Sequence, residues 1–191
     1  KRHSLACFQR SRRSGALPQA SDEGGNELTH IYVQAPDGST TDLTPGAKLK
    51  ANFLGWAGDD RSFLLSTNER DPRYFDLYGI TTDGYARTLL YRNTEGFDLG
   101  DVSRDTRYVA LAKSRTTSDA DIFLHDRTRN TTTNITAHAG NVNNRPADFS
   151  PDGSRLLFIS DAGGEFASLR SFEIATGTAK PIYKEKWDVG G

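Results

Sequence analysis

Three segments rich in arginine and carboxylates have the clearest potential for chemistry in this sequence. They are 68–73, 115–119 and 161–165, and they contain the candidate binding residues Asn68, Glu69, Arg70, Asp71, Arg73, Arg115, Asp119 and Glu165. An arginine guanidinium can bind a carboxylate through two parallel hydrogen bonds, so these segments could bind peptide termini or dock a second domain. The alternative is that they are solvated turns, whose internal ion pairs add little stability.

The residues that usually catalyse reactions or bind metals form no recognisable pattern. His30, His125 and His138 lack the spacing of metal ligands and a matched carboxylate and nucleophile nearby, which favours packed or surface roles. Asp119 and Asp121 resemble the start of a calcium loop, but apolar residues follow where further oxygen ligands belong. No G-x-S-x-G nucleophile motif occurs. We therefore expect no catalytic residue, no metal and no cofactor.

The composition is that of an ordinary folded protein. The 191 residues are 35% hydrophobic and 26% charged, and no run approaches the roughly 18 apolar residues of a membrane helix, so no membrane partner is expected. The basic residues within 1–13 could contact nucleic acid, but no aromatic platform or basic stripe continues them, which favours a frayed tail and no nucleic-acid partner. The single cysteine, Cys7, leaves both cytoplasm and periplasm open. Because the sequence starts at Lys1 and contains no methionine, we expect either a processed chain or an excerpt of a longer one.

A repeat runs through the sequence at two independent landmarks. At the first, residues that tolerate a left-handed conformation recur every 46 or 47 positions, at Gly38, Gly84, Asn130 and Gly177. At the second, a turn followed by an apolar run recurs at 56–65, 102–111 and 149–158. Aromatic and β-branched runs lie between the landmarks at 74–80, 121–126 and 169–174. Each repeat therefore predicts about four strands.

Four antiparallel strands per repeat of this length predict an all-β fold, namely a β-propeller of about 3.5 to 4 blades that forms part of a ring. We expect full blades at 51–96, 97–144 and 145–191, after a partial blade at 28–50, within a propeller region of 27–191. Residues 1–26 do not fit the repeat, and we expect an irregular or disordered basic segment there. A parallel β-helix would use shorter rungs, and a β-sandwich would not repeat its sequence.

The motif Phe149-Ser150-Pro151-Asp152-Gly153-Ser154-Arg155-Leu156 resembles the blade motif of TolB-like, WD40-like propellers. A longer pattern, which includes Leu43-Thr44-Pro45-Gly46 and the segments 67–76, 83–91 and 114–121, is similar to the N-terminal propeller of bacterial prolyl-oligopeptidase-type (S9) serine peptidases. This resemblance covers about residues 28–191.

The family resemblance implies a function for the parent protein. In that family the propeller precedes an α/β-hydrolase domain with a serine, aspartate and histidine triad, and it admits short peptides while excluding folded proteins. The resemblance thus implies a non-catalytic domain that gates substrate access to this hydrolase domain and docks with it. Dipeptidyl members bind the substrate amine with two adjacent glutamates, and this sequence has no such pair.

Two other functions are possible for a propeller of this kind. One is a TolB-like protein-interaction propeller without enzymatic activity, although the blades do not end in the Trp-Asp dipeptide of WD repeats. The other is a propeller enzyme with chemistry in its central channel, which needs a ring of ligands or acids at equivalent positions. The sequence shows no such ring.

Overall fold

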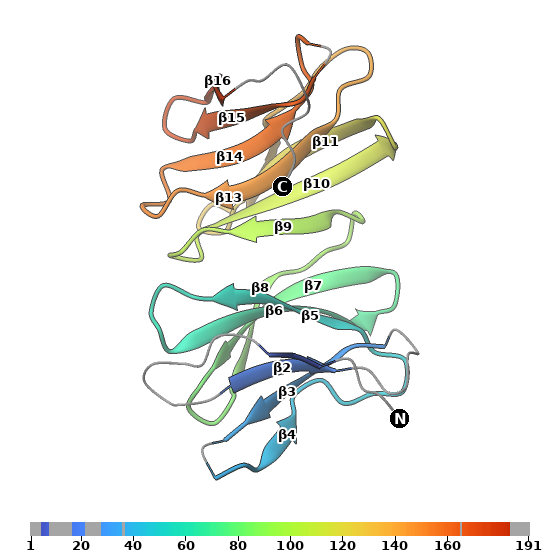
Figure 1. Cartoon of the computed structure of the whole chain (residues 1–191), viewed down its shortest axis with the longest axis vertical. Coiled ribbons are helices and arrows are strands. Elements are labelled where there is room, and N and C mark those ends of the chain that lie inside the picture. Colours follow the sequence, from blue (N-terminus) through green and yellow to red (C-terminus); the bar gives the residue numbers. More distant parts are fainter. Residues whose placement is uncertain (1–4, 8–16, 22–27, 36, 165, 184–191) are drawn as a thin grey trace. The chain divides into compact units, whose positions relative to one another are not determined.

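A computed structural model describes residues 5–7, 17–21, 28–35, 37–164 and 166–183, and this part of the chain consists of strands, turns and irregular connections (Figure 1). In chain order the strands are β1 (Leu5–Cys7), β2 (Leu17–Ser21), β3 (His30–Gln34), β4 (Thr40–Asp42), β5 (Ala51–Trp56), β6 (Ser62–Asp71), β7 (Tyr74–Thr81), β8 (Arg87–Tyr91), β9 (Asp98–Val102), β10 (Tyr108–Thr116), β11 (Asp119–Asp126), β12 (Thr131–Asn134), β13 (Asn144–Phe149), β14 (Arg155–Ser160), β15 (Ser168–Glu173) and β16 (Thr178–Tyr183). No described segment is a helix long and apolar enough to cross a membrane.

The strands form four sheets of four antiparallel strands each, and consecutive strands pair within every sheet. The orders are β1-β2-β3-β4, β5-β6-β7-β8, β9-β10-β11-β12 and β13-β14-β15-β16. This topology confirms the prediction of an all-β fold built from four-stranded antiparallel repeats. The third full blade is predicted to begin at residue 145, whereas its first strand, β13, begins one residue earlier, at Asn144. The other blade boundaries remain a proposal.

The first sheet reaches further towards the N-terminus than the sequence predicts. Residues 1–26 were expected to be irregular, whereas β1 and β2 lie there and extend the sheet of β3 and β4. Strand β2 pairs along β3, from Leu17 opposite Gln34 to Ser21 opposite His30. The repeat could not reveal β2, because Pro18 interrupts its strand pattern. Pro18 has no N–H and lies outside the β1–β2 ladder, which pairs only residues 19–21 of β2.

Both sequence landmarks mark turns with a left-handed residue. At the first, φ is +86° at Gly38, +70° at Gly84, +51° at Asn130 and +67° at Gly177. At the second, φ is +54° at Asp60, +58° at Thr106 and +69° at Gly153. The repeat therefore encodes backbone geometry more strictly than residue type, because even the β-branched Thr106 adopts a conformation that costs it energy.

The chain divides into two compact units, residues 1–96 and 97–191, each with two sheets and its own core. In the first unit Val33 of β3 packs with Phe63, Leu65 and Ile80, and Trp56 lies against this cluster. The core of the second unit contains Ala110, Ile122, Leu124, Leu156, Phe158 and Phe172. Each core joins side chains from two consecutive sheets, so neighbouring blades bury each other's apolar faces. Trp56 thus lies at the contact between the two sheets of the first unit.

Candidate functional site

Most of the predicted binding residues lie where the second strand of a blade turns into the third. Asn68, Glu69, Arg70, Asp71 and Arg73 belong to the β6–β7 hairpin of the first unit. Arg115 and Asp119 belong to the β10–β11 hairpin of the second unit. Glu165, in the β14–β15 connection, lies outside the described residues.

Arg70 is bound to the chain's own groups through two hydrogen bonds to one buried carboxylate. Its Nε donates to Asp76 Oδ2 at 2.6 Å and its Nη2 to Asp76 Oδ1 at 2.8 Å, while Nη2 also reaches the carbonyl oxygen of Asn93 at 2.5 Å. The Asp76 side chain is completely buried and also accepts the backbone N–H of Asn93. The hydrogen bonds with Asp76 raise the pKa of Arg70 above its ordinary value. Arg70 therefore fixes the end of the hairpin, and its guanidinium is already engaged.

At the tip of the same hairpin, Asp71 and Arg73 form an exposed pair. Asp71 Oδ1 accepts hydrogen bonds from the backbone N and from Nε of Arg73, both at 3.0 Å, and Oδ2 accepts Arg73 Nη2 at 2.8 Å. These bonds lower the pKa of Asp71 to about 2. The Arg73 side chain is 73% exposed, so it is the arginine of this hairpin that solvent and ligands can reach.

Asn68 and Glu69 connect the hairpin to its neighbours in the first unit. Asn68 Oδ1 accepts the backbone N–H of Lys50 at 2.7 Å, which ties β6 to the segment before β5. Glu69 Oε2 accepts a hydrogen bond from Arg87 Nη1 of β8 at 2.8 Å. All five predicted residues in this hairpin thus have specific partners within the unit, and Arg73 presents the most accessible charge.

The β10–β11 hairpin repeats this arrangement. Arg115 donates from Nε and Nη2 to Asp119 at 2.9 and 2.8 Å, and from Nη1 to Asp121 Oδ2 at 2.6 Å. These bonds raise the pKa of Arg115 above its ordinary value. Asp121 lies opposite Lys113, just as Asp76 lies opposite Thr67 one repeat earlier. The arginine-to-carboxylate contact is therefore a repeated feature of two blades.

The third hairpin lacks this carboxylate. At the equivalent ladder position Ser168 lies opposite Ser160 and donates a hydrogen bond to its carbonyl oxygen at 3.2 Å. Among the described residues of the three hairpins, the contact between an arginine and this ladder carboxylate occurs in β6–β7 and β10–β11.

His138 completes the cluster around Arg115, which the sequence spacing did not predict. Its Nδ1 lies 2.9 Å from the carbonyl oxygen of Thr136 and 3.0 Å from Asp121 Oδ1, so Nδ1 carries a proton. Its Nε2 lies 3.1 Å from Asp119 Oδ1 and 3.2 Å from Arg115 Nη2. Asp119 and Asp121 are far from His138 in the sequence, and the connection from β12 to β13 brings His138 back onto the hairpin beside them. This packed position agrees with the structural role that the sequence favours. The separation from both aspartates is too long for any local motif.

This geometry predicts a pH dependence of stability. The hydrogen bond to the Thr136 carbonyl and the contacts with Asp119 and Asp121 raise the pKa of His138. A raised pKa in the folded state means that protonated His138 stabilises the fold below about pH 6.5, and that this stabilisation disappears as pH rises through the folded pKa. We expect urea unfolding to show a stability advantage of the wild type over His138→Gln that is largest near pH 6 and smaller near pH 8.

A second histidine makes the comparison with the variant necessary. Burial lowers the pKa of His125, so its titration acts in the opposite direction. The difference between wild type and His138→Gln cancels that contribution. An equal difference at both pH values would contradict the assignment of the stabilising proton to His138.

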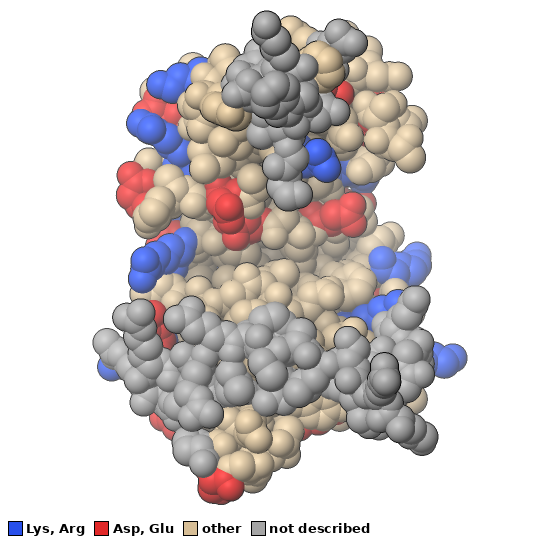
Figure 2. Space-filling model, viewed as in Figure 1, with Lys and Arg blue, Asp and Glu red and all other residues tan. Residues whose placement is uncertain are grey.

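The remaining candidates play structural roles in the part of the chain that is described. His30 Nδ1 lies 2.9 Å from Asp42 Oδ2, and His125 Nδ1 lies 2.9 Å from Thr132 Oγ1. Within the described residues no group of three or more His, Cys, Asp or Glu side chains could hold a metal ion. Both signs of charge occur on the face of each unit drawn in Figure 2. Within each unit the hairpin end therefore presents preorganised polar groups.

Comparisons with known proteins show which proteins the chain is similar to. No protein-family model matches the sequence. The chain is 26% identical over 176 residues to dipeptidyl aminopeptidase BIII of Pseudoxanthomonas mexicana, a match that covers 89% of the chain and 25% of that protein. The chain is homologous to an S9-family peptidase.

Solved structures agree with a propeller fold for the chain. A prolyl endopeptidase matches 96% of the chain with a TM-score of 0.71 and 18% identity, over 29% of its own length. TolB from Acinetobacter baumannii matches 96% of the chain with a TM-score of 0.58 and 14% identity, over 42% of its own length. The predicted relationship to TolB-like and prolyl-oligopeptidase-type propellers is confirmed, and the chain spans a quarter of the length of its curated relative.

Proposed function

We propose that this chain is the propeller portion of a serine peptidase, in which it docks with an α/β-hydrolase domain and gates the access of short peptides to it. The observation that carries the proposal is the match to a dipeptidyl aminopeptidase over 89% of the chain. The absence of a nucleophile motif in these 191 residues agrees with a domain that controls substrate access and does not itself catalyse hydrolysis.

The hairpin ends are suited to such a role. Arg70 and Arg115 are each bound to carboxylates of their own hairpin, so the backbone between β6 and β7 and between β10 and β11 is held in one conformation. A rigid hairpin discriminates between substrates by size better than a flexible one, because a large substrate cannot push it aside at low cost. At the end of the β6–β7 hairpin, Arg73 remains as an exposed cation.

The first test asks whether the natural full-length protein is a serine peptidase. We expect a serine-reactive fluorophosphonate probe to label it at a serine outside residues 1–191, and we expect it to cleave short fluorogenic peptides. Absence of labelling would leave the alternative, a TolB-like interaction propeller, which the TolB match supports.

The second test addresses gating by comparing the two ends of β6. Asp71→Ala loosens the tip of the β6–β7 hairpin, whereas Asp59→Ala removes a similar turn at the opposite end, where Asp59 accepts the N–H groups of Arg61 and Ser62. We expect Asp71→Ala to raise the cleavage rate of a long peptide relative to a dipeptide substrate severalfold, and Asp59→Ala to leave that ratio unchanged. If the probe labels the protein but Asp71→Ala and Asp59→Ala give the same ratio of long-peptide to dipeptide cleavage, the gating proposal is rejected. The proposal that the parent protein is a serine peptidase would still stand.

A further inference from the structure

The segment that connects β12 to β13, residues 135–143, joins the hairpin ends of the two sheets of the second unit. The backbone N–H of Ala120, at the start of β11, donates to the carbonyl oxygen of Val142 at 3.0 Å. The backbone N–H of Asn143 donates to Asp161 Oδ1 at 2.9 Å, in the connection between β14 and β15. We call this segment the strap, because it bridges two neighbouring sheets at the ends of their middle strands.

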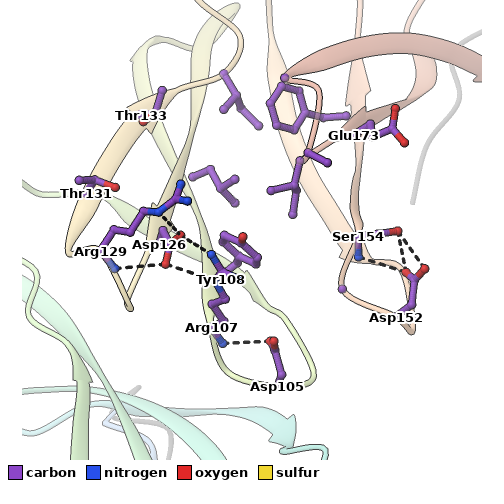
Figure 3. Close-up of a pocket in the computed structure, with 17 residues that line it drawn as sticks. Asp105, Arg107, Tyr108, Asp126, Arg129, Thr131, Thr133, Asp152, Ser154 and Glu173 are labelled. Carbon is purple, nitrogen blue, oxygen red and sulfur yellow. Dashed lines mark hydrogen bonds and ion pairs between the residues drawn. The ribbon is translucent and has the colours of Figure 1, made fainter.

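At the opposite ends of these strands the same two sheets are separated by a cavity of about 600 Å³ (Figure 3). The polar contacts drawn there stay within one sheet and its turns. Arg107 and the backbone N–H of Arg129 bind Asp126 on one side, and Ser154 binds Asp152 on the other. The strap therefore provides, at the hairpin end, polar contacts between the sheets that the residues drawn at the cavity do not make.

His138 fastens the strap to the β10–β11 hairpin through both nitrogens of its ring. Its Nε2 lies 3.1 Å from Asp119 Oδ1, and its Nδ1 lies 3.0 Å from Asp121 Oδ1 and 2.9 Å from the carbonyl oxygen of Thr136. The imidazole is only 12% exposed, so these contacts lie largely out of water. Oxygen acceptors thus face both ring nitrogens, an arrangement that suits an imidazolium ion with its two N–H donors.

The other groups that face the imidazole are one cation and one neutral amide. Arg115 Nη2 lies 3.2 Å from His138 Nε2, and Asn144 Nδ2, from β13, lies 3.5 Å from Nδ1. With His138 protonated, two cations face the carboxylates of Asp119 and Asp121. Without that proton, Nε2 no longer donates to Asp119, and its lone pair faces the carboxylate. Arg115 can still donate to the neutral ring, so loss of the proton loosens the strap and leaves part of the cluster intact.

We propose that the strap is a pH-sensitive fastening, which protonated His138 holds on the β10–β11 hairpin and which opens locally when that proton is lost, while the rest of the unit stays folded. The contacts with Thr136, Asp119 and Asp121 raise the pKa of His138, so the strap is fastened below about pH 6.5 and loosens as pH rises through the folded pKa. Residues 139–141, in the middle of the strap, are exposed, so they bury little surface that would keep it in place.

Hydrogen exchange of the natural full-length protein, measured by mass spectrometry near pH 6 and near pH 9, tests the proposal. Labelling times are corrected for the effect of pH on intrinsic amide exchange. We expect peptides that contain the amides of Ala120 and Asn143 to exchange roughly three- to tenfold faster near pH 9 than near pH 6. This readout follows the strap itself, so it does not depend on the proposed peptidase function.

The connection between β8 and β9 is an internal control, because it is fastened to the β6–β7 hairpin in a similar way without a histidine. There the backbone N–H of Asn93 donates to Asp76 Oδ1 at 2.8 Å. Its corrected exchange should be the same at both pH values. Equal corrected exchange of the strap at both pH values, or an equal change at Asn93, would overturn the proposal.

Two histidine variants assign the effect to one ring. His138→Gln removes the titrating group but keeps a side chain that can form hydrogen bonds, so the pH difference at the strap should disappear. His30→Gln is the matched control, since His30 Nδ1 also lies 2.9 Å from a carboxylate, that of Asp42, but in the first unit. It should leave the pH difference at the strap unchanged. The wild-type comparison needs no variant, so a folding defect cannot obscure it. A pH difference that persists in His138→Gln would show that another group controls the strap.

Discussion

Replacing Asp76 by alanine is expected to destabilise the protein by about 1–3 kcal/mol, because it leaves the partly buried Arg70 guanidinium and the Asn93 backbone N–H without this acceptor. The Asp76 carboxylate is completely buried, and its loss removes the acceptor of two Arg70 donors and of the Asn93 backbone N–H. Those donors then remain in the hairpin without their carboxylate. Typical domains are stable by only about 5–15 kcal/mol, so the midpoint of urea unfolding should fall sharply with little change in slope.

Two comparisons separate the buried charge from a general effect of the hairpin. Asp71→Ala removes an aspartate that also pairs with an arginine, but its partner Arg73 is 73% exposed, so the urea midpoint should move far less. The double variant Arg70→Met/Asp76→Leu should be more stable than Asp76→Ala, since it leaves no uncompensated charge. If the double variant were as unstable as Asp76→Ala, the loss would come from packing rather than from the unpaired guanidinium.

The features that the sequence predicts well are those encoded locally. A left-handed residue such as Gly84 or Gly177 marks a hairpin by its own backbone preference, and the recurrence of such residues predicts the four-stranded repeat. The strands β6 and β10 could be located in the same way, because each begins directly after the turn of the second landmark. Repetition supplies several independent readings of one structural unit, which makes the prediction of the fold strong.

Contacts between distant positions could not be predicted in this way. The sequence identifies Arg70 and Arg115 as binding candidates, but it does not reveal that Asp76 and Asp121 already occupy them, because the residue pairing depends on strand register. His138 meets Asp119 only after the chain has passed through all of β12. That residues at the ends of the β6–β7 and β10–β11 hairpins contact a substrate or another domain stays a prediction.

Close packing between blades leads to the second large effect, at Gly100. This residue lies on β9, where a Cβ atom would be 2.6 Å from Pro146 Cγ of β13 and 3.1 Å from the carbonyl oxygen of Ala110. Neither the proline ring nor the backbone can move away easily, so Gly100→Ala should destabilise the protein by about 1–3 kcal/mol in urea unfolding. The glycine is thus required for the contact between the first strands of two neighbouring blades.

A second glycine and a double-mutant cycle test this explanation. At Gly79 the nearest atom to an added Cβ is the flexible Leu90 Cδ1 at 3.3 Å, so Gly79→Ala should cost much less. In a Pro146→Ala background the ring Cγ is absent, and Gly100→Ala should then cost less than it does in the wild type, although the Ala110 carbonyl still limits the relief. An unchanged cost would mean that the Ala110 carbonyl and the Cβ of residue 146, which both remain at 3.1 Å, are enough to exclude the side chain. The close approach of β9 to β13 would then not depend on the proline ring.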